Sequence, residues 1–256
     1  MGILNVTPDS FSDGNQHFSL EKALLQAEKM IGEGADIIDA GGYSSRPGAD
    51  DVTVEEEIRR VIPVIGAIHQ KWPEQFISVD TFRAEVARKA VEAGACMVND
   101  ISAGNLDNRM IATVAELGTP YVLMHMKGTP KTMQNEPQYE NVVEDINRFF
   151  EKKLQELRTA GVDQVILDPG FGFGKTPEHN QQIAAEFKAF KTNGLPILAG
   201  VSKKSFIQKM YGTLPVQVLE GTLKVNEDLV RKGAVIMRVH DVREHREMVE
   251  RIKITG

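Results

Sequence analysis

Short apolar runs recur along the whole chain, and longer amphipathic stretches separate them. The runs occupy residues 3–4, 36–39, 76–79, 96–98, 121–124, 165–167, 197–199 and 235–237. A strand that is buried on both faces of a parallel sheet reads as a continuous apolar run rather than an alternating one. The runs therefore predict eight short parallel strands.

Apolar residues at helical spacing fill the intervals between these strands. The predicted helices cover residues 20–31, 53–65, 86–91, 111–117, 138–160, 176–190, 215–232 and 241–253. Thr53 and Glu56 have the spacing of a capping box, and Thr176 followed by Pro177 suits an N-cap with proline at the first helical position. Several predicted helices are followed by a glycine that suits the positive φ of a C′ position, namely Gly34, Gly94, Gly161 and Gly233.

Eight strand–helix units in 256 residues predict an α/β protein, a (β/α)8 TIM barrel in which residues 1–256 form a single domain. A doubly wound open sheet is the alternative, because it has the same alternation of strands and helices. The first predicted strand begins at residue 1, so we expect that a natural N-terminal segment has been trimmed.

The composition is that of an ordinary globular domain, which excludes a disordered or fibrous chain. Hydrophobic residues make up 41%, and 30 Lys and Arg against 36 Asp and Glu give a formal charge of −6. This mild acidity argues against a nucleic-acid partner. No apolar run approaches the roughly 20 residues that span a membrane, and the first residues do not resemble a secretory signal. The single cysteine, Cys96, fits a reducing compartment, so we expect a cytoplasmic protein.

Polar residues stand where most of the predicted strands end. They are Asn5, Asp39, Asp80, Asn99, His125 after Met124, Asp168, Ser202 and Arg238. The chemistry of a barrel lies at the carboxyl ends of its strands, so this ring predicts a functional site. The alternative is that single aspartates, such as Asp80 and Asp100, only cap the helices that follow them.

Two kinds of chemistry are represented in the ring. Asp80, Asn99 and Asp168 combine carboxylates with an amide, which suits a flat heterocycle with amino and lactam groups, such as a pterin or guanine. A purely structural hydrogen-bond network is the alternative. A second group consists of cations in three of the loops, namely Arg46, Lys203, Lys204, Arg238 and His240. These cations predict a phosphate site, although Lys203 also fits a solvated surface charge.

The segment 170–176 resembles a nucleotide-binding phosphate loop but fails its spacing, because Pro169 stands where the pattern requires glycine. Its glycines are interpreted as places where the backbone approaches a planar ligand, with Phe173 beside it. The histidines match no helical zinc motif, and no Gly-x-Ser-x-Gly nucleophile motif is present. A hard cation is still possible, because magnesium takes one or two protein oxygens plus substrate phosphates and Asn5 offers one oxygen.

Eight segments resemble the dihydropteroate synthase family, in that family's order and over essentially the whole chain. They are MGILNVTPDSFSDG (1–14), GGYSSRPG (41–48), SVDT (78–81), ND (99–100), LMHMKGTP (123–130), DPGFGFGK (168–175), SKKSF (202–206) and RVHDV (238–242). The resemblance implies a (β/α)8 barrel that condenses 6-hydroxymethyl-7,8-dihydropterin pyrophosphate with p-aminobenzoate. The implied products are 7,8-dihydropteroate and pyrophosphate, formed through an SN1-like step in folate biosynthesis.

The resemblance also implies roles for individual residues. The pterin is expected on Asp80, Asn99, Met124, Asp168 and Lys204. The pyrophosphate is expected on Asn5, Arg46, Arg238 and His240, with Mg²⁺ as cofactor on Asn5. The p-aminobenzoate pocket is expected beside Phe11, Ser45, Pro47, Phe173 and Ser205. The implied catalytic residues are Asp80, Asp168, Lys204, Arg238 and His240. A homodimer and binding of sulfonamides in the p-aminobenzoate pocket are further expectations.

The chain departs from the family's usual pattern at several positions. Tyr43 replaces a common Glu or Gln, Lys203 replaces a common Arg, and Asn15 replaces a glycine. Residues 219–228 are more polar than the Ala-rich helix often found there, which bears on how the family packs its last helices in a dimer.

Two rival functions share part of this residue set. A methyltetrahydrofolate–corrinoid methyltransferase is also a pterin-binding barrel, but it does not need Arg46, Lys204 and the pair Arg238 and His240. A catalytically silent paralogue that binds a pterin is the other alternative, suggested by the polar stretch 219–228.

Overall fold

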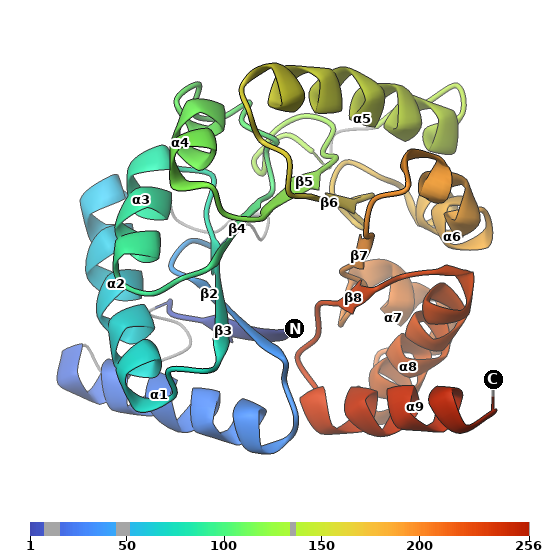
Figure 1. The fold of residues 1–256 in the computed structure, drawn as a ribbon. Helices are drawn as coiled ribbons and strands as arrows, with labels where there is room; N and C mark the ends of the chain where they lie inside the picture. Colours follow the sequence, from blue (N-terminus) through green and yellow to red (C-terminus); the bar gives the residue numbers. More distant parts are fainter. Residues whose placement is uncertain (8–15, 45–51, 134–136, 256) are drawn as a thin grey trace.

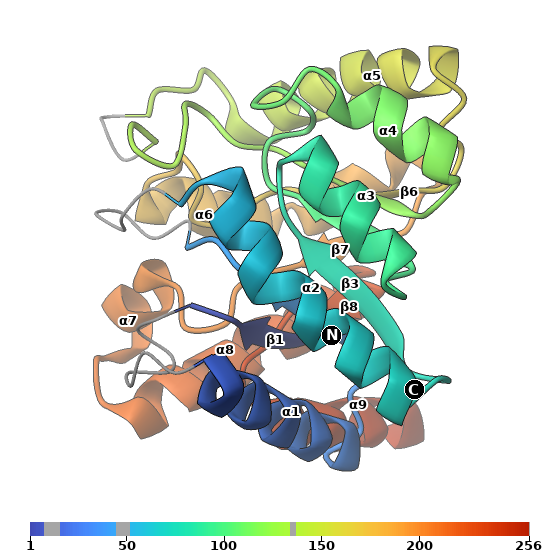
Figure 2. The ribbon, with the colours of Figure 1, turned by 90° about the vertical axis from the view of Figure 1, so that its left-hand side faces the viewer.

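The computed structural model describes residues 1–7, 16–44, 52–133 and 137–255. In this part of the chain, parallel strands form a ring and helices surround it on the outside (Figure 1). The helix that opens the described chain after residue 15 and the C-terminal helix lie side by side in both Figure 1 and Figure 2. The two ends of the chain therefore meet in the outer layer as well as in the ring.

The strands follow the predicted order. They are β1 (Gly2–Asn5), β2 (Ile37–Gly41), β3 (Phe76–Asp80), β4 (Met97–Asp100), β5 (Tyr121–Met124), β6 (Val165–Asp168), β7 (Leu198–Ala199) and β8 (Ile236–Met237). Strands β1 to β6 form one parallel sheet in sequence order, and β7 pairs with β8. Parallel bridges from Leu167 to Ile197 and from Gly2 to Val239 close the two seams. The ring is therefore closed, and the open sheet is excluded.

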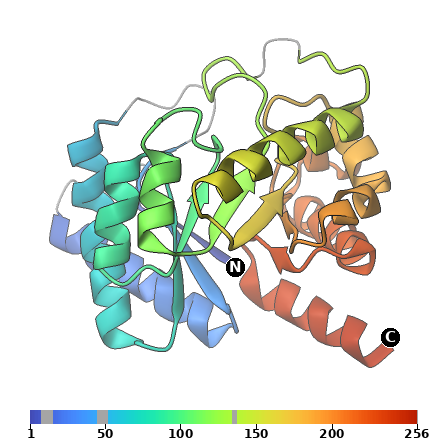
Figure 3. The same cartoon turned by 45° about the horizontal axis from the view of Figure 1, so that its top comes forward.

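The helices are α1 (Gln16–Gly32), α2 (Val54–Lys71), α3 (Ala84–Glu92), α4 (Met110–Leu117), α5 (Val142–Thr159), α6 (Pro177–Ala185), the 3-10 helix η2 (Phe187–Asn193), α7 (Ser205–Tyr211), α8 (Pro215–Lys232) and α9 (Val242–Thr255). Figure 3 shows α4 and α5 on the outer side of the strands. Within the described residues, no helix is both long and apolar enough to cross a membrane.

Three helix predictions differ from the structure. Helix α5 begins at Val142 rather than residue 138, because the Asn141 side chain caps it by accepting from the amide of Val143 at 3.0 Å. Phe187 and Phe190 do not continue α6 but lie in η2, where residues three apart face the same side and both rings are buried. Helix α7 was not predicted, since its seven residues are too few for a periodic pattern.

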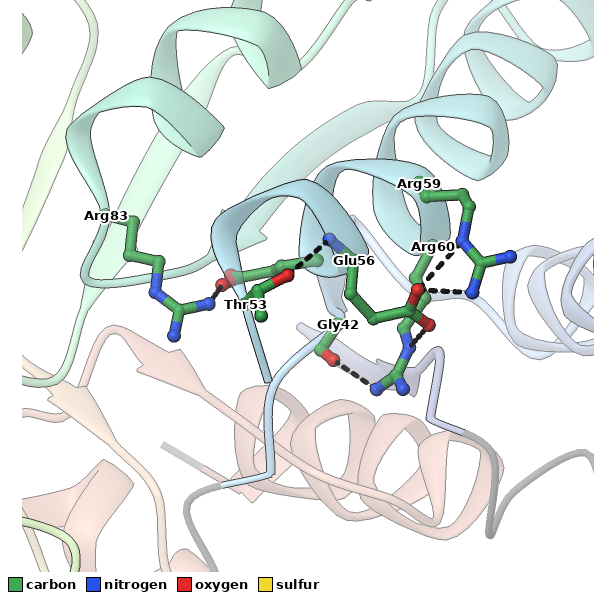
Figure 4. Close-up of polar contacts among 7 residues, drawn as sticks. Gly42, Thr53, Glu56, Arg59, Arg60 and Arg83 are labelled. Carbon is green, nitrogen blue, oxygen red and sulfur yellow. Dashed lines mark hydrogen bonds and ion pairs between the residues drawn. The ribbon is translucent and has the colours of Figure 1, made fainter. Parts of the chain in front are cut away.

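The predicted capping box at the start of α2 is half formed. Thr53 Oγ1 accepts from the Glu56 amide at 3.2 Å, as expected. The Glu56 carboxylate instead pairs with Arg59 and with Arg60, whose Nε lies 2.7 Å from Glu56 Oε1 (Figure 4). Arg60 also donates to the carbonyl of Gly42 at 3.2 Å, so this side chain ties α2 to the end of β2.

Two apolar layers hold the barrel together. The larger one lies between the strands and the helices and includes Ile38, Val98, Phe150 and Phe206. The smaller one fills the ring itself and consists of Met97, Val122, Ile166 and Leu198, with Met1, Ile37 and Ile236 packed against them. The barrel interior is therefore closed by packed side chains rather than open as a pore.

Polar residues in the stretch 219–228 face the inside of α8 as well as its outside. Thr222 and Asn226 are fully buried. The Thr222 hydroxyl donates to the Val218 carbonyl at 2.7 Å, and Asn226 Nδ2 lies 2.9 Å from His245 Nε2 on α9. Part of the polarity noted in the sequence therefore joins α8 to α9.

Asp100 fits the capping alternative, because it organises the turn that follows β4. Its carboxylate accepts from the amides of Ser102 and Gly104, each at 2.7 Å. The Tyr121 hydroxyl, which is fully buried, donates to the same group at 2.7 Å. We expect Tyr121→Phe to lower the free energy of unfolding by about 1 to 2 kcal/mol, because a buried acceptor loses a donor.

Urea unfolding at neutral pH measures this change. The matched control is Tyr211→Phe, since the Tyr211 hydroxyl has no hydrogen-bond partner among the described residues. The control is expected to change stability by less than about 0.5 kcal/mol. Equal stability of both variants would show that the buried hydroxyl contributes nothing.

Candidate active site

A polar layer lies directly above the apolar plug inside the ring. Residues two apart on a strand point to the same face, so each plug residue predicts the direction of the residue two positions further on. The pairs are Ile37 with Asp39, Met97 with Asn99, Val122 with Met124, Ile166 with Asp168, and Ile236 with Arg238. The structure therefore brings the strand-end residues together inside one mouth of the barrel.

Arg238 lies at the centre of this layer and joins opposite sides of the ring. Its Nε donates to Asp39 Oδ2 and its Nη2 to Asp80 Oδ2, both at 2.6 Å. Asn99 Nδ2 donates to the same oxygen of Asp39 at 3.0 Å. The third guanidinium nitrogen has no partner among the described residues, so it is available to a ligand.

Burial sets the protonation of the carboxyl groups in this layer. Removal from water raises the pKa of Asp80 to about 7 from its usual 3.8, Arg238 opposes this shift, and the charge of Asp39 adds to it. Between these two pH values the folded chain holds a proton that the unfolded chain releases. Protonation of Asp80 therefore stabilises the fold below a pH of about 4, and this contribution is lost as the pH rises through 7.

Asp168 and Lys204 form the other side of the layer. Burial raises the pKa of Asp168, although its Oδ1 accepts from the Gly170 amide at 2.7 Å. Burial lowers the pKa of Lys204 to about 8, with Arg238 acting in the same direction and the two aspartates against it. The pair thus places a carboxylate and a cation with a readily lost proton at one mouth, which suits binding of a polar heterocycle.

An apolar cluster borders the polar layer. Met124 packs with Ile101, Met133 and Phe173. Lys204 Nζ lies 4.0 Å from the centre of the Phe173 ring, so the aromatic ring separates the cation from the apolar cluster. Met124 and Phe173, expected beside the pterin and p-aminobenzoate respectively, therefore lie side by side.

The predicted phosphate ligands at the end of β8 are held by the loop after β7. The Ser202 hydroxyl lies 2.9 Å from His240 Nδ1 and also accepts from the His240 amide, so it fixes the imidazole ring. Lys203 is exposed and pairs with Asp241 at 2.9 Å, which agrees with a surface charge.

Other predicted site residues are placed without close partners or lie outside the described part. Asn5 ends β1 at the same mouth, and Ser205 begins α7 with its side chain exposed. Phe11, Ser45, Arg46 and Pro47 lie outside the described residues.

The residue that follows this last segment is tied to α2 and to the loop after β3. Arg83 donates to the carbonyl of Val52 and, at 2.6 Å, to Glu57 Oε2 (Figure 4 labels the arginine). Arg83 also lies over the ring of Phe82, and Tyr43 packs edge-on against that ring with centroids 5.0 Å apart. The unusual Tyr43 is therefore one member of an aromatic contact at the mouth of the site.

The glycines after β6 allow close packing between two loops. A Cβ on Gly170 would lie 2.0 Å from the carbonyl oxygen of His125, and one on Gly174 would lie 2.3 Å from that of Lys127. Both glycines have positive φ. The close backbone approach predicted for this segment is thus made to the end of β5, rather than to a planar ligand as expected.

Two residues important for this geometry were not predicted. Asp39 was noted only as a strand-end residue, yet it is fully buried and binds both Arg238 and Asn99. Its inward direction follows from Ile37 two residues earlier. Lys175 was considered only as part of a failed phosphate loop, and its side chain is instead turned into the protein.

Comparisons with known proteins agree with this arrangement. The family model described as pterin binding enzyme matches residues 1–240. Dihydropteroate synthase of Escherichia coli (strain K12) is 46% identical over 257 residues, which cover 100% of this chain and 90% of that protein. The structure of Yersinia pestis dihydropteroate synthase with a sulfonamide drug has a TM-score of 0.93 and 42% identity, covering 100% of this chain and 93% of that one. Dihydropteroate synthase of Xanthomonas albilineans with 4-aminobenzoic acid has a TM-score of 0.92 and 41% identity, covering 100% and 92%.

The charge of Asp39 generates a testable prediction about Asp80. We expect Asp39→Asn to lower the pKa of Asp80 below about 7, because the variant removes a nearby negative charge and leaves Arg238 to pair with Asp80 alone. A pH titration of the aspartate side-chain carbons by NMR measures this pKa. Asp36→Asn is the control, since Asp36 precedes the same strand but is exposed. An unchanged pKa in Asp39→Asn would mean that the Asp39 charge does not act on Asp80.

Proposed function

This chain belongs to the dihydropteroate synthase family, and we propose that it joins 6-hydroxymethyl-7,8-dihydropterin pyrophosphate to p-aminobenzoate. The observation that carries this proposal is the buried layer in which Asp80, Asn99 and Asp168 face Arg238 and Lys204. Carboxylates accept paired N–H groups, and an amide both donates and accepts, so the layer suits the edge of a pterin.

The first step breaks the bond between the pterin methylene carbon and the pyrophosphate oxygen. The electron pair stays on the oxygen, so negative charge develops on pyrophosphate and positive charge on the pterin. Arg238 and His240, together with Arg46, would stabilise the pyrophosphate. Asp80 and Asp168 would stabilise the pterin cation, and their burial makes this electrostatic effect stronger than it is in water.

In the second step the amino nitrogen of p-aminobenzoate attacks the methylene carbon and then loses a proton. Phe173, with Met124 beside it, supports an aromatic substrate on this side of the mouth. Phe11, Ser45, Pro47 and Ser205 complete the proposed pocket. No protein nucleophile takes part, which agrees with Ser202 serving to hold His240. Sulfonamides would compete for the same pocket.

Magnesium is the proposed cofactor. Among the described residues, no group of three His, Cys, Asp or Glu side chains is placed to hold a metal ion. A magnesium ion that keeps its waters and binds substrate phosphates needs only one or two protein oxygens, and Asn5 at the mouth fits that demand. The ion would supply positive charge to the leaving pyrophosphate.

A homodimer and a cytoplasmic location are also proposed. Support for the dimer comes from exposed apolar side chains at the junction of α7 and α8, namely Met210, Leu214 and Val216. Support for the cytoplasm comes from the single cysteine, Cys96, which is exposed and has no partner for an intramolecular disulfide.

Release of pyrophosphate by the purified chain tests the function. The reaction contains the dihydropterin pyrophosphate and Mg²⁺, with and without p-aminobenzoate. Release that depends on p-aminobenzoate is expected. Pterin binding without any release would indicate the catalytically silent paralogue, and methyl transfer from methyltetrahydrofolate would indicate the rival methyltransferase.

Arg238→Lys tests the role of the guanidinium. The variant keeps a positive charge between Asp39 and Asp80 but loses the planar fork, so kcat/KM is expected to fall by about a hundredfold. Arg243→Lys on α9 is the control, because Arg243 is exposed and lies outside the site. Wild-type kinetics in Arg238→Lys would show that the fork is not used.

The magnesium requirement of Asn5→Ala tests the metal site. We expect chelation of the metal to abolish pyrophosphate release, and Asn5→Ala to raise the Mg²⁺ concentration for half-maximal rate by about tenfold. Asn105→Ala is the matched control, since Asn105 is exposed after β4. An unchanged requirement in Asn5→Ala would place the metal on other atoms.

A further inference from the structure

Lys175 ends the glycine-rich segment after β6, and its side chain is 4% exposed. Its Nζ lies 2.8 Å from the carbonyl oxygen of Gly170, 3.0 Å from that of Phe173 and 3.1 Å from that of His125. His125 Nδ1 lies 3.0 Å away as a fourth neighbour. One ammonium group therefore links several turns of a loop to the end of a neighbouring strand.

The ammonium supplies what this loop otherwise lacks. The glycine conformations after β6 point carbonyl groups inward, where the backbone offers them few donors. A Lys175 ammonium has three protons, which match the three carbonyl oxygens, and the imidazole can accept only when it is neutral. Burial lowers the pKa of His125 well below its usual value, and the positive charge of Lys175 acts in the same direction. The cluster thus carries a single positive charge.

Two of the residues bound by Lys175 also contact the active site directly. Gly170 gives its carbonyl to Lys175 and its amide to Asp168 Oδ1, at 2.7 Å for the latter. Phe173 gives its carbonyl to Lys175, while its ring lies against Lys204 and packs with Met124. Lys175 itself lies behind these groups and does not face the mouth.

We propose that Lys175 is a positioning residue for the arylamine side of the reaction. It holds the loop after β6 against His125 and so fixes the Phe173 ring over Lys204. This inference rests on the proposed p-aminobenzoate pocket. The pterin ligands Asp80 and Asn99 are carried by other strands, so they do not depend on this loop.

Burial lowers the pKa of Lys175 to about 7, and Asp168 opposes this shift. The same charge favours the ionised form of Asp168. Packing leaves the loop little freedom to rearrange, because a Cβ at Gly170 would overlap the His125 carbonyl. Loss of the ammonium would therefore leave three buried carbonyl groups without this donor, and the loop would have to shift to reach water.

Lys175→Met tests the proposal, because methionine has a similar length and no charge. The KM for p-aminobenzoate is expected to rise by about tenfold or more, because the aromatic wall moves. The dissociation constant of the dihydropterin pyrophosphate, measured by calorimetry without p-aminobenzoate, is expected to stay within about threefold of wild type. Circular dichroism confirms that the variant is folded. Lys188→Met on η2 is the matched control, since Lys188 is exposed and outside the site.

Two further variants make every outcome decisive. If Lys175→Met does not fold, Lys175→Arg keeps a cation but its larger guanidinium must displace the loop, so the KM for p-aminobenzoate should rise by about threefold or more. An unchanged KM in a folded variant would overturn the proposal, as would an equal loss of affinity for both substrates. Phe173→Leu separates this failure from failure of the pocket assignment, because an unchanged KM in that variant would mean that Phe173 does not contact p-aminobenzoate.

Discussion

The site depends on one interaction, the pairing of Arg238 with Asp39 and Asp80 across the barrel. Charges buried inside a ring of strands are costly unless opposite charges and hydrogen bonds compensate them. Here one guanidinium satisfies two carboxylates, one of which also accepts from Asn99. The arrangement links β8, which closes the ring next to β1, to β2, β3 and β4. Closure of the barrel and formation of the polar layer are therefore parts of the same structural event.

The same layer is poised for a reaction that separates charge. Asp80 holds its proton near neutral pH because it is buried, and Lys204 is close to losing its own. A ligand with complementary hydrogen-bonding groups changes both balances, because it replaces lost water contacts with fixed ones. Arg238 contributes one free nitrogen toward the mouth while its other two stay on carboxylates, so the cation that would face pyrophosphate is already oriented.

Around this layer, loops are fixed by backbone contacts more than by side chains that face a ligand. The glycines after β6 pack against the end of β5, and Lys175 binds the carbonyls that this packing turns inward. Arg60 and Arg83 act similarly near α2, where each joins a carboxylate to a backbone carbonyl. Buried polar side chains on α8 and α9 serve the outer layer in the same way.

The sequence by itself determined the fold and the composition of the site. Doubly apolar runs and helical stripes identified the strands and most helices, because burial on both faces leaves a direct trace in the residue pattern. The ends of these runs named Asp80, Asn99, Asp168 and Arg238. The tertiary structure alone decided which of them meet. The partner of Arg238 lies 199 residues away in Asp39, and no local pattern encodes that distance. The inward turn of Lys175 was equally invisible, since it follows from acceptors that come together only when the loop after β6 packs on β5.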